Sequence, residues 1–343
     1  MKAALLHRIK DIRLEEIEKP AFAPDEVLVR IKSVGVCGSD VTYFVQGHIG
    51  NQIVTAPHIL GHECSGEIVE TGSEVRGIER GARVAIEPGI PCGRCPSCRK
   101  GYYNICPEGR FLGTPPVPGA YREYISYPTD FIFPLPSGIG YDEGAMIEPL
   151  AVAVHAVDLG NVQNGDSVAI LGAGSIGLLT LQCAISAGAA FSLTTDLIPE
   201  RLRLAKKYGA DVVINAGKEK VIPRIKEKTE GQGVDIVFDA AGEAETFQQS
   251  IHIVRPGGTV VLIGICREDM VSLDFQTARR KELVIKNVRR FRHTYKRAIS
   301  LVAKGKIEVK SLITHRFDLP RLPEAFELVE GRRDGVIKAV IEI

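Results

Sequence analysis

The sequence predicts an α/β protein in two parts, a mostly-β part followed by a doubly wound parallel sheet. Residues 1 to about 150 alternate short β-rich runs with Gly and Pro, as antiparallel strands and turns do. From Asp166 onward, apolar strand-like runs alternate with amphipathic stretches, which is typical of successive βα units. A glycine-rich GxGxxG turn opens this second part. We therefore expect two domains.

Composition and charge indicate which kinds of molecule this protein is expected to bind. The 343 residues are 45% hydrophobic and 25% charged, as in ordinary globular proteins. Forty-three Lys and Arg against 42 Asp and Glu give a net charge of +1, without the basic field that nucleic-acid binders carry. The N-terminal apolar run is broken by His7, Arg8 and Lys10, and no segment has membrane-spanning length. We expect a small-molecule partner, no nucleic acid, no membrane and a cytoplasmic location.

Four cysteines crowd into "PCGRCPSCRKGYYNICPEGR", at Cys92, Cys95, Cys98 and Cys106. In a reducing compartment, cysteines at two-residue gaps are metal ligands more readily than disulfides. Ferredoxins also use CxxCxxC before a Cys-Pro pair, but they place three residues before that last cysteine, where this chain has seven. The spacing predicts a structural zinc site in a lobe over residues 89–110, closed by four thiolates. An iron-sulfur cluster and unligated thiols are the alternatives.

The glycine-rich turn predicts a dinucleotide site. Gly172 permits the turn after an apolar strand, Gly174 lets the backbone approach a pyrophosphate, and Gly177 lets the following helix pack closely. That helix begins at the turn and its N-terminus suits phosphate groups. A second strand, "FSLTTD", ends in Asp196, where an acid meets the adenosine ribose. The predicted cofactor contacts of this part of the chain are Gly172, Gly174, Ser175, Ile176, Gly177, Asp196, Arg201, Ile263, Gly264 and Ile265.

Asp196 also favours NAD over NADP. Its carboxylate can accept hydrogen bonds from both ribose hydroxyl groups of NAD, whereas it would repel the 2′-phosphate of NADP. Two like charges about 4 Å apart, at an effective dielectric constant near 20, repel by roughly 4 kcal/mol before screening. Arg201 can offset part of that repulsion. The sequence therefore predicts NAD as the cofactor.

A second set of metal-ligand types lies in the β-rich part. "VGVCGSD" contains Cys37, "LGHECSG" contains His62 and Glu63, and "MIEPL" contains Glu148. A thiolate, an imidazole and a carboxylate can hold zinc with one position open, which is the catalytic kind of site. Spacing alone does not distinguish this from a buried thiol and unrelated paired acids, since long stretches separate the candidates.

The motifs taken together resemble those of the zinc-dependent medium-chain dehydrogenases. "GVCGSD", "GHECSG", "GARVAIEPG", the four-cysteine lobe, "GAGSIG" and "DEGAMIEPL" follow in order over essentially the whole chain. Within that superfamily, "GSDVTYFVQGHIG" and "IEPLAVAVHA" resemble the sorbitol and xylitol dehydrogenase branch. Simple alcohol dehydrogenases typically have a cysteine at the position of Glu148.

This resemblance implies a fold, two zinc ions and an assembly. It implies a split GroES-like catalytic domain, residues 1–150 and 287–343, around a Rossmann NAD-binding domain over 151–286. It implies that Cys37, His62 and Glu63 ligate the catalytic zinc, with Glu148 as a fourth ligand or held through water. It also implies a homotetramer or homodimer.

The resemblance further implies reversible hydride transfer from a secondary alcohol of a polyol to NAD⁺, giving a ketose. Ser39 resembles the hydroxyl that relays the alcohol proton, and Glu148 can pass that proton on. Because a buried hydroxyl without a partner costs roughly 1 to 3 kcal/mol, polar groups should line a polyol pocket. The expected substrate contacts are Tyr43, Phe111, Glu148, Arg290 and Phe291, and the resemblance implies that Arg290 also contacts the cofactor.

Three alternatives stay open at this point. The first is a dehydrogenase of the threonine or simple alcohol type. The second is a polyol phosphate or sugar acid as substrate, since the segment 289–297 is rich in arginine, although a solvated basic helix also explains it. The third is a zinc-lobed NAD-binding module without turnover, which the presence of Cys37, His62 and Glu63 disfavours.

Overall fold

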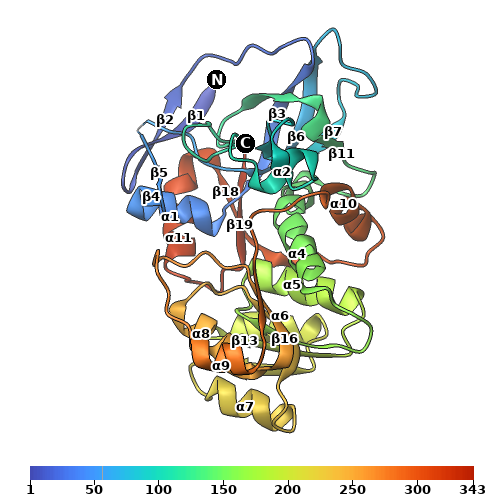
Figure 1. Ribbon diagram of the computed structural model, residues 1–343. Coiled ribbons are helices and arrows are strands. Elements are labelled where there is room, and N and C mark those ends of the chain that lie inside the picture. Colours follow the sequence, from blue (N-terminus) through green and yellow to red (C-terminus); the bar gives the residue numbers. More distant parts are fainter. Residues whose placement is uncertain (56) are drawn as a thin grey trace. The chain divides into compact units, whose positions relative to one another are not determined.

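The computed structural model describes residues 1–55 and 57–343, which group into two units (Figure 1). The first unit comprises Met1–Glu148 and Tyr295–Ile343, and the second comprises Pro149–Thr294. Both chain termini therefore belong to the first unit.

A seven-stranded sheet forms the centre of the first unit, in the order β11-β7-β6-β3-β19-β18, with β10 also pairing with β3. Only β18 and β19 in this sheet pair in parallel. Strand β3 shows why the sheet forms, because alternate residues Val27, Val29 and Ile31 are fully buried. The strands of the sheet are β3 (Glu26–Gly35), β6 (Glu63–Thr71), β7 (Arg83–Ile86), β10 (Tyr124–Pro128), β11 (Ile132–Pro134), β18 (Ile313–Asp318) and β19 (Lys338–Glu342).

Short hairpins and helices surround this sheet. Helix α1 (Gly38–Gln46) follows β3, with Cys37 as its N-cap, and its C-cap, Gly47, has the left-handed conformation (φ 76°). The hairpin strands are β1 (Lys2–Arg8) with β2 (Asp11–Glu16), β4 (His48–Ile49) with β5 (Gln52–Ile53), and β8 (Gly89–Ile90) with β9 (Arg110–Phe111). The helices are α1 (Gly38–Gln46), α2 (Pro96–Arg99), α3 (Tyr141–Ala145), α10 (Tyr295–Ala303) and α11 (Leu322–Glu330), with short 3₁₀ turns at Tyr103–Ile105, Thr129–Phe131, Lys310–Leu312 and Leu319–Arg321.

The second unit is a six-stranded parallel sheet in the order β14-β13-β12-β15-β16-β17. Numbered within the unit this order is 3-2-1-4-5-6, that of a doubly wound dinucleotide-binding sheet. The strands are β12 (Ser167–Leu171), β13 (Phe191–Asp196), β14 (Val212–Asn215), β15 (Val234–Asp239), β16 (Val254–Leu262) and β17 (Val284–Asn287). The helices are α5 (Ser175–Ser186), α6 (Pro199–Lys207), α7 (Val221–Lys228), α8 (Ala244–Ile253) and α9 (Phe275–Arg280), and α4 (Ile147–Gly160) precedes β12.

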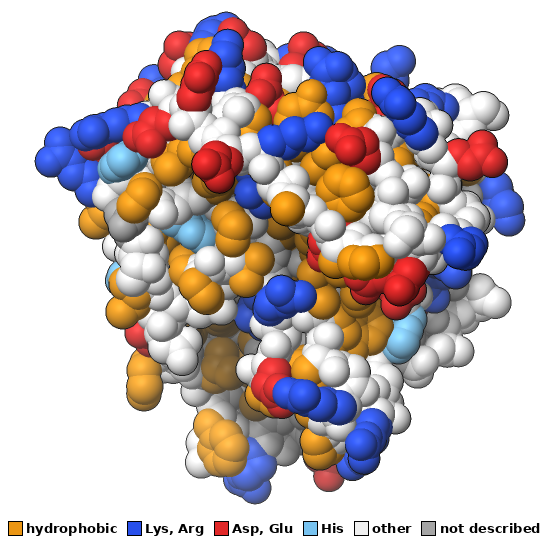
Figure 2. Space-filling model, turned by 90° about the horizontal axis from the view of Figure 1, so that it is seen from above, with side chains coloured by type: hydrophobic (Ala, Val, Ile, Leu, Met, Phe, Trp, Pro, Cys, Tyr) orange, Lys and Arg blue, Asp and Glu red, His pale blue; other side chains and the backbone are white. Residues whose placement is uncertain are grey.

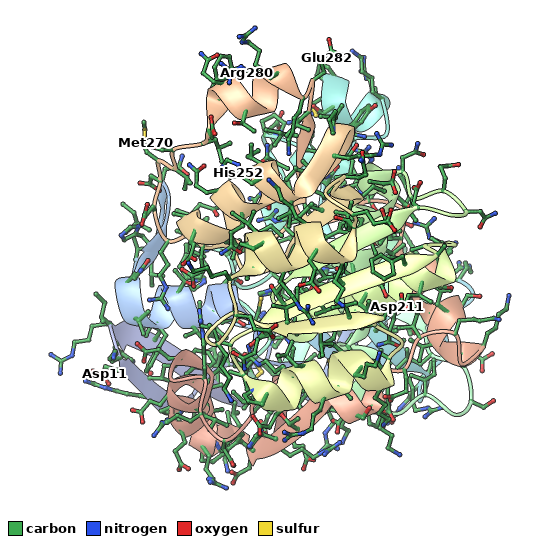
Figure 3. The ribbon with its side chains drawn as sticks, turned by 90° about the horizontal axis from the view of Figure 1, so that it is seen from below. Asp11, Asp211, His252, Met270, Arg280 and Glu282 are labelled. Atoms are coloured by element: carbon green, nitrogen blue, oxygen red, sulfur yellow. The ribbon has the colours of Figure 1, made fainter. Side chains whose placement is uncertain are left out.

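The predicted α/β fold class is confirmed, with a parallel sheet in one unit and a mixed sheet in the other. Because all strands of this sheet run in the same direction, the sheet has an amino edge, where the strands begin, and a carboxyl edge, where they end. Asp211 and Met270, labelled on opposite sides of Figure 3, mark these edges, since Asp211 precedes β14 and Met270 lies in the segment after β16. The carboxyl edge, where β12, β13 and β15 end, contains the glycine-rich turn.

The division between the units differs slightly from the expected limits. The units divide after Glu148 and after Thr294, where the sequence predicts divisions after residues 150 and 286. Residues 287–294 group with the second unit because β17 is the sixth strand of the parallel sheet, and Val288 then donates to the Leu262 carbonyl oxygen (2.8 Å). The Thr294 hydroxyl also donates to the Ala151 carbonyl oxygen (3.1 Å).

Two further observations concern the surface. Acidic and basic side chains are interspersed on the face seen in Figure 2, in keeping with the net charge of +1. Among the described residues, every helix is too short or too polar to span a lipid bilayer.

Candidate active site and metal centres

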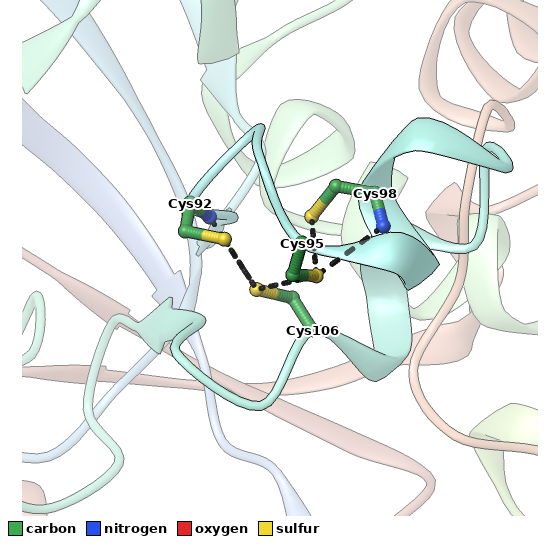
Figure 4. Close-up of side chains that lie close together, drawn as sticks. All are labelled: Cys92, Cys95, Cys98 and Cys106. Atoms are coloured by element: carbon green, nitrogen blue, oxygen red, sulfur yellow. Dashed lines mark hydrogen bonds between the residues drawn. The ribbon is translucent and has the colours of Figure 1, made fainter.

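The four lobe cysteines converge on one point (Figure 4). Cys95 Sγ lies 3.4 Å from Cys98 Sγ and 3.9 Å from Cys106 Sγ, and Cys106 Sγ lies 3.5 Å from Cys92 Sγ. All four sulfurs lie within 4.8 Å of one another. Sulfurs bound tetrahedrally at about 2.3 Å from one zinc ion stand about 3.8 Å apart, so this donor set fits zinc. Since four thiolates fill a tetrahedron, the site has the form of a closed, structural one.

The backbone of the lobe is built for this convergence. Helix α2 begins directly after Cys95, whose sulfur accepts from the Cys98 amide (3.4 Å). Pro96 occupies the first helical position, where its fixed φ suits a helix start. Gly93 turns the chain in the left-handed region (φ 71°), which glycine adopts at little cost. The two-residue gaps seen in the sequence therefore correspond to a turn followed by one short helix.

A buried carboxyl group joins the lobe to the central sheet of the first unit. Glu87 is 5% exposed and follows β7, and its Oε1 accepts from the Tyr103 hydroxyl of the lobe (2.8 Å). Burial raises the pKa of Glu87 to about 7, although the Tyr103 hydrogen bond opposes that rise. This contact was not predicted from the sequence.

A second donor group lies where β3 ends and β6 begins. Ligand atoms of Cys37, His62 and Glu63 lie within 4.8 Å of one another. The register places Glu63 opposite Gly35, and a side chain at Gly35 would collide with the Glu63 carboxylate. The sheet thus brings together residues that are 25 positions apart in the sequence. Gly35 leaves the room that the carboxylate occupies.

Asp40 contacts two of the residues that could bind a metal, Cys37 and His62. This buried carboxylate accepts from the Gly61 amide (3.2 Å), the Cys37 amide (3.3 Å) and the Tyr121 hydroxyl (3.3 Å). Its Oδ1 also lies 3.4 Å from His62 Nδ1, which leaves Nε2 as the ring nitrogen for a metal. Burial alone would lower the pKa of His62, but Asp40 and Cys37 raise it well above its usual value. The site therefore stabilises positive charge, so a divalent cation fits it.

Lys338 places a buried ammonium group beside this cluster. Its Nζ donates to Glu63 Oε1 (2.8 Å), to Glu63 Oε2 (2.6 Å) and to the Val36 carbonyl oxygen (3.0 Å). Burial lowers the pKa of Lys338, but the charges of Glu63 and Cys37 outweigh this and raise it. Sequence reasoning missed Lys338, Asp40 and Tyr121. A signal existed for Lys338, because it interrupts the apolar run "VIKAVIEI".

The other predicted residues of the first unit lie in varied surroundings. Glu148 is buried and lies outside the group of three, and burial raises its pKa to about 7, a rise that His62 opposes and Glu63 reinforces. The Ser39 hydroxyl donates to Cys37 Sγ (3.2 Å). The Tyr43 hydroxyl donates to Gln52 Oε1 (3.3 Å). The Phe111 ring lies 5.4 Å from the His62 ring.

The glycine-rich turn has the geometry that the sequence predicts. Gly172 has φ 92°, and a Cβ there would lie 2.9 Å from the Ala241 nitrogen. A side chain at Gly177 would collide with the Gly172 carbonyl oxygen, which explains the glycine requirement for close packing. Gly174 is the N-cap of α5, and a Cβ there would meet only Arg201 Nη1, at 3.9 Å, among the described atoms within 4 Å. Open space beside Gly174 suits close approach of a phosphate group.

Asp196 ends β13 beside this turn. Its Oδ2 accepts from the Ala173 amide (2.7 Å) and its Oδ1 accepts from the Ile198 amide (2.8 Å). Arg201 Nη1 lies 3.9 Å from Asp196 Oδ2. Ser175 and Ile176 begin α5, and residues 263–265 follow β16 at the same sheet edge. Arg290 (φ 54°) and the buried Phe291 belong to the second unit, whereas Tyr43 and Phe111 belong to the first.

Comparison with known proteins identifies the family. Residues 23–137 match the alcohol dehydrogenase GroES-like domain, and residues 175–304 match the zinc-binding dehydrogenase domain. The chain is 38% identical over 341 residues to sorbitol dehydrogenase of Bacillus subtilis, covering 99% of this chain and 97% of that protein. It is 38% identical to L-idonate 5-dehydrogenase of Vitis vinifera, covering 99% and 94%.

Solved structures agree with this assignment. A protein of Sinorhizobium meliloti, described as a zinc-binding dehydrogenase and solved with NADP, superposes with a TM-score of 0.92 at 34% identity, covering 100% of this chain and 99% of that one. The chain belongs to the zinc-dependent medium-chain dehydrogenases, in the polyol dehydrogenase branch, and the resemblance seen in the motifs is confirmed. It is therefore an oxidoreductase of the zinc-type alcohol dehydrogenase family.

The buried pair Lys338–Glu63 yields a stability prediction. Lys338→Met leaves the Glu63 carboxylate buried without its counter-ion, and we expect the free energy of unfolding to fall by about 3 to 5 kcal/mol in urea titrations of metal-free protein. The double variant Lys338→Met, Glu63→Gln should regain part of that loss, because no unpaired charge remains. Lys32→Met, on the adjacent strand, is the control and should change stability by less than about 0.5 kcal/mol. Equal losses in the single and double variants would contradict this account.

The buried carboxyl group of Glu87 yields a pH prediction. Because its folded pKa of about 7 exceeds the ordinary value of 4.5, the folded state binds more protons between these values and loses stability as pH rises. Relative to Glu87→Gln, the wild-type protein should lose about 2 kcal/mol of unfolding free energy between pH 5 and pH 8. Urea unfolding at several pH values measures this, with the exposed Glu74→Gln as the control. A pH-independent difference would refute the buried titration.

Proposed function

We propose that this chain is an NAD-dependent zinc polyol dehydrogenase that reversibly oxidises a secondary alcohol to a ketone, giving a ketose. The observation that carries the proposal is the convergence of Cys37, His62 and Glu63 within 4.8 Å. That donor set suits zinc with an open position. The chain's place in the polyol dehydrogenase branch supports a polyol as substrate.

We assign the metals and the cofactor as follows. Cys37, His62 and Glu63 would hold the catalytic zinc, with Glu148 as a fourth ligand or held through water, and the four lobe cysteines would hold a structural zinc. The glycine-rich turn of the second unit would hold the dinucleotide, which makes this the NAD-binding domain and the first unit the catalytic domain. When bound, the zinc supplies Lewis-acid activation of a hydroxyl group and the nicotinamide supplies the hydride acceptor.

The chain's own residues orient the ligands and move the proton. Asp40 fixes the ring of His62 through Nδ1, so that Nε2 keeps its lone pair. The Ser39 hydroxyl, which donates to Cys37 Sγ (3.2 Å), would accept the hydroxyl proton of the substrate in this proposal. A carboxyl group whose pKa is about 7 suits a proton acceptor near neutral pH, and Glu148 meets that condition. Tyr43, Phe111, Arg290 and Phe291 remain our candidates for substrate contact.

A sugar acid or polyol phosphate is the second candidate substrate class. The relative from Vitis vinifera is an L-idonate 5-dehydrogenase, and idonate carries a carboxylate. The arginine-rich segment 289–297 offers guanidinium groups that suit a carboxylate or phosphate. Cytoplasmic location and a homotetramer or homodimer remain expectations from the family.

NADH formation tests the activity. The panel should contain sorbitol, xylitol, galactitol, a polyol phosphate, a sugar acid, L-threonine and ethanol, with absorbance of NADH followed over time. We expect turnover of at least one polyol, and strong turnover of threonine or ethanol beside none of polyols would refute the proposal.

Metal analysis separates the two sites within that test. We expect two zinc ions per chain in the wild-type protein. Cys37→Ser should lose one zinc and lower kcat by at least about a thousandfold, since it removes a ligand of the reacting centre. Cys92→Ser should lose the other zinc and lower the melting temperature, while kcat should change little. A Cys92→Ser protein with an unchanged melting temperature and no kcat would contradict the assignment of the lobe as structural.

Asp196 yields a prediction on cofactor choice. The wild-type protein should have a higher kcat/KM for NAD than for NADP, because the Asp196 carboxylate repels a 2′-phosphate. Asp196→Asn keeps an oxygen for the Ala173 amide but removes the charge, so kcat/KM for NADP should rise by about tenfold or more. Arg201→Ala is the matched control and should lower the use of NADP. A wild-type preference for NADP would overturn the assignment of NAD.

A further inference from the structure

A single carboxylate ties together the turns at the carboxyl edge of the parallel sheet. Asp239 is the last residue of β15 and is fully buried. Its Oδ1 accepts from the amides of Ala241 (2.9 Å) and Gly242 (3.0 Å). Its backbone carbonyl oxygen accepts from the amides of Ile263 (2.8 Å) and Gly264 (2.9 Å), which follow β16. One residue thus holds the segments that follow two neighbouring strands.

The segment held by Asp239 packs directly against the glycine-rich turn. A Cβ at Gly172 would lie 2.9 Å from the Ala241 nitrogen, and a Cβ on Gly264 would collide with Gly242. The Ala240 amide also donates to the Leu171 carbonyl oxygen (2.8 Å), at the end of β12. The segments after β12, β15 and β16 therefore touch through backbone, and a shift of residues 240–242 is transmitted to Gly172 and Gly264.

The carboxylate is under strong constraint. Its Oδ2 is buried and makes no hydrogen bond to any part of the chain that the structure describes. The Thr246 hydroxyl, which lies near it, donates instead to the Glu243 carbonyl oxygen (2.9 Å). Burial raises the pKa of Asp239 to about 6, against the opposing effect of Thr246 and of the two amides. Burying a carboxylate oxygen without a hydrogen bond lowers the stability of the fold, so we expect Asp239 to have a specific role.

We propose that Asp239 is a positioning residue for the dinucleotide: by holding residues 240–242 against Gly172 and Gly264, it sets the shape of the surface on which the cofactor lies. This inference rests on the proposed binding of a nicotinamide dinucleotide by the second unit. Because Asp239 is fully buried, its proposed effect on the cofactor is carried by the two amides that it fixes.

The test measures the Kd of NADH by isothermal titration calorimetry, because the chain has no tryptophan whose fluorescence NADH could quench, together with the melting temperature without cofactor. Asp239→Ala should raise the Kd by about tenfold or more. Asp239→Asn keeps an oxygen for the two amides and should restore the Kd to within about threefold of wild type. In steady state, the KM for NAD should rise in Asp239→Ala while the KM for the alcohol stays nearly unchanged.

Asp235 provides a matched control on the same strand. It lies at the other end of β15, where its Oδ2 accepts from the Ser167 amide (2.8 Å) and its Oδ1 from Arg255 Nε (2.6 Å). Asp235→Ala should lower the melting temperature and leave the Kd of NADH unchanged. A purely structural role for Asp239 would give the same pattern in Asp239→Ala, and that result would overturn the proposal.

A second variant covers the case in which Asp239→Ala does not fold. Ala241→Pro removes one of the two amides that donate to Asp239 Oδ1, so it should raise the Kd of NADH in the same way, and an unchanged Kd in folded Ala241→Pro protein would also overturn the proposal. If the wild-type protein bound neither NADH nor NADPH, the proposed function itself would be wrong. If the wild-type protein bound NADH and Asp239→Ala bound it equally well, only the proposal about Asp239 would be wrong.

Discussion

The ammonium group of Lys338 is the interaction on which the candidate catalytic cluster depends. It lies buried among Glu63, Cys37 and Glu148, and it is supplied by β19, which pairs with β3 in the middle of the sheet. Without that positive charge, the cluster would bury several acidic groups with few partners, which is costly in a low-dielectric interior. The same strand pairing that builds the core of the first unit therefore also balances the charge of its site.

The two sets of side chains that could bind metal are held in place by different kinds of structure. The lobe sulfurs come from one short stretch, held by a turn, a four-residue helix and the contact between Glu87 and Tyr103. Cys37, His62 and Glu63 lie instead where β3 ends and β6 begins. Asp40 contacts His62 and Lys338 contacts Glu63. A local loop can close around an ion by itself, whereas a site with an open position needs rigid strands to hold fewer ligands in place.

Sequence patterns predicted what is local and missed what is distant. The cysteine spacing, the GxGxxG turn and Asp196 are short-range signals: the four sulfurs converge, the turn lies between β12 and α5, and Asp196 ends β13. Cys37, His62 and Glu63 were singled out through a resemblance, because nothing in their spacing marks them. A lysine within "VIKAVIEI" is a local signal, but Lys338 is 275 residues from Glu63 and Asp239 accepts from backbone amides, so the sequence does not indicate the partner of either residue. The units divide after Thr294, eight residues later than the limit that the sequence predicts, and β17, a short and partly exposed edge strand, has only a weak apolar pattern to mark it.

The separation of Glu63 and Lys338 along the chain has a consequence for biosynthesis. A ribosome adds about 5 to 20 residues per second, so the acid waits on the order of 15 to 50 seconds for its base to emerge. During that interval β3 also lacks β19 as its neighbour, and the nascent sheet presents an open edge beside a cluster of uncompensated acids. Nascent chains of this enzyme are thus expected to need protection from premature association until translation has passed the Rossmann segment.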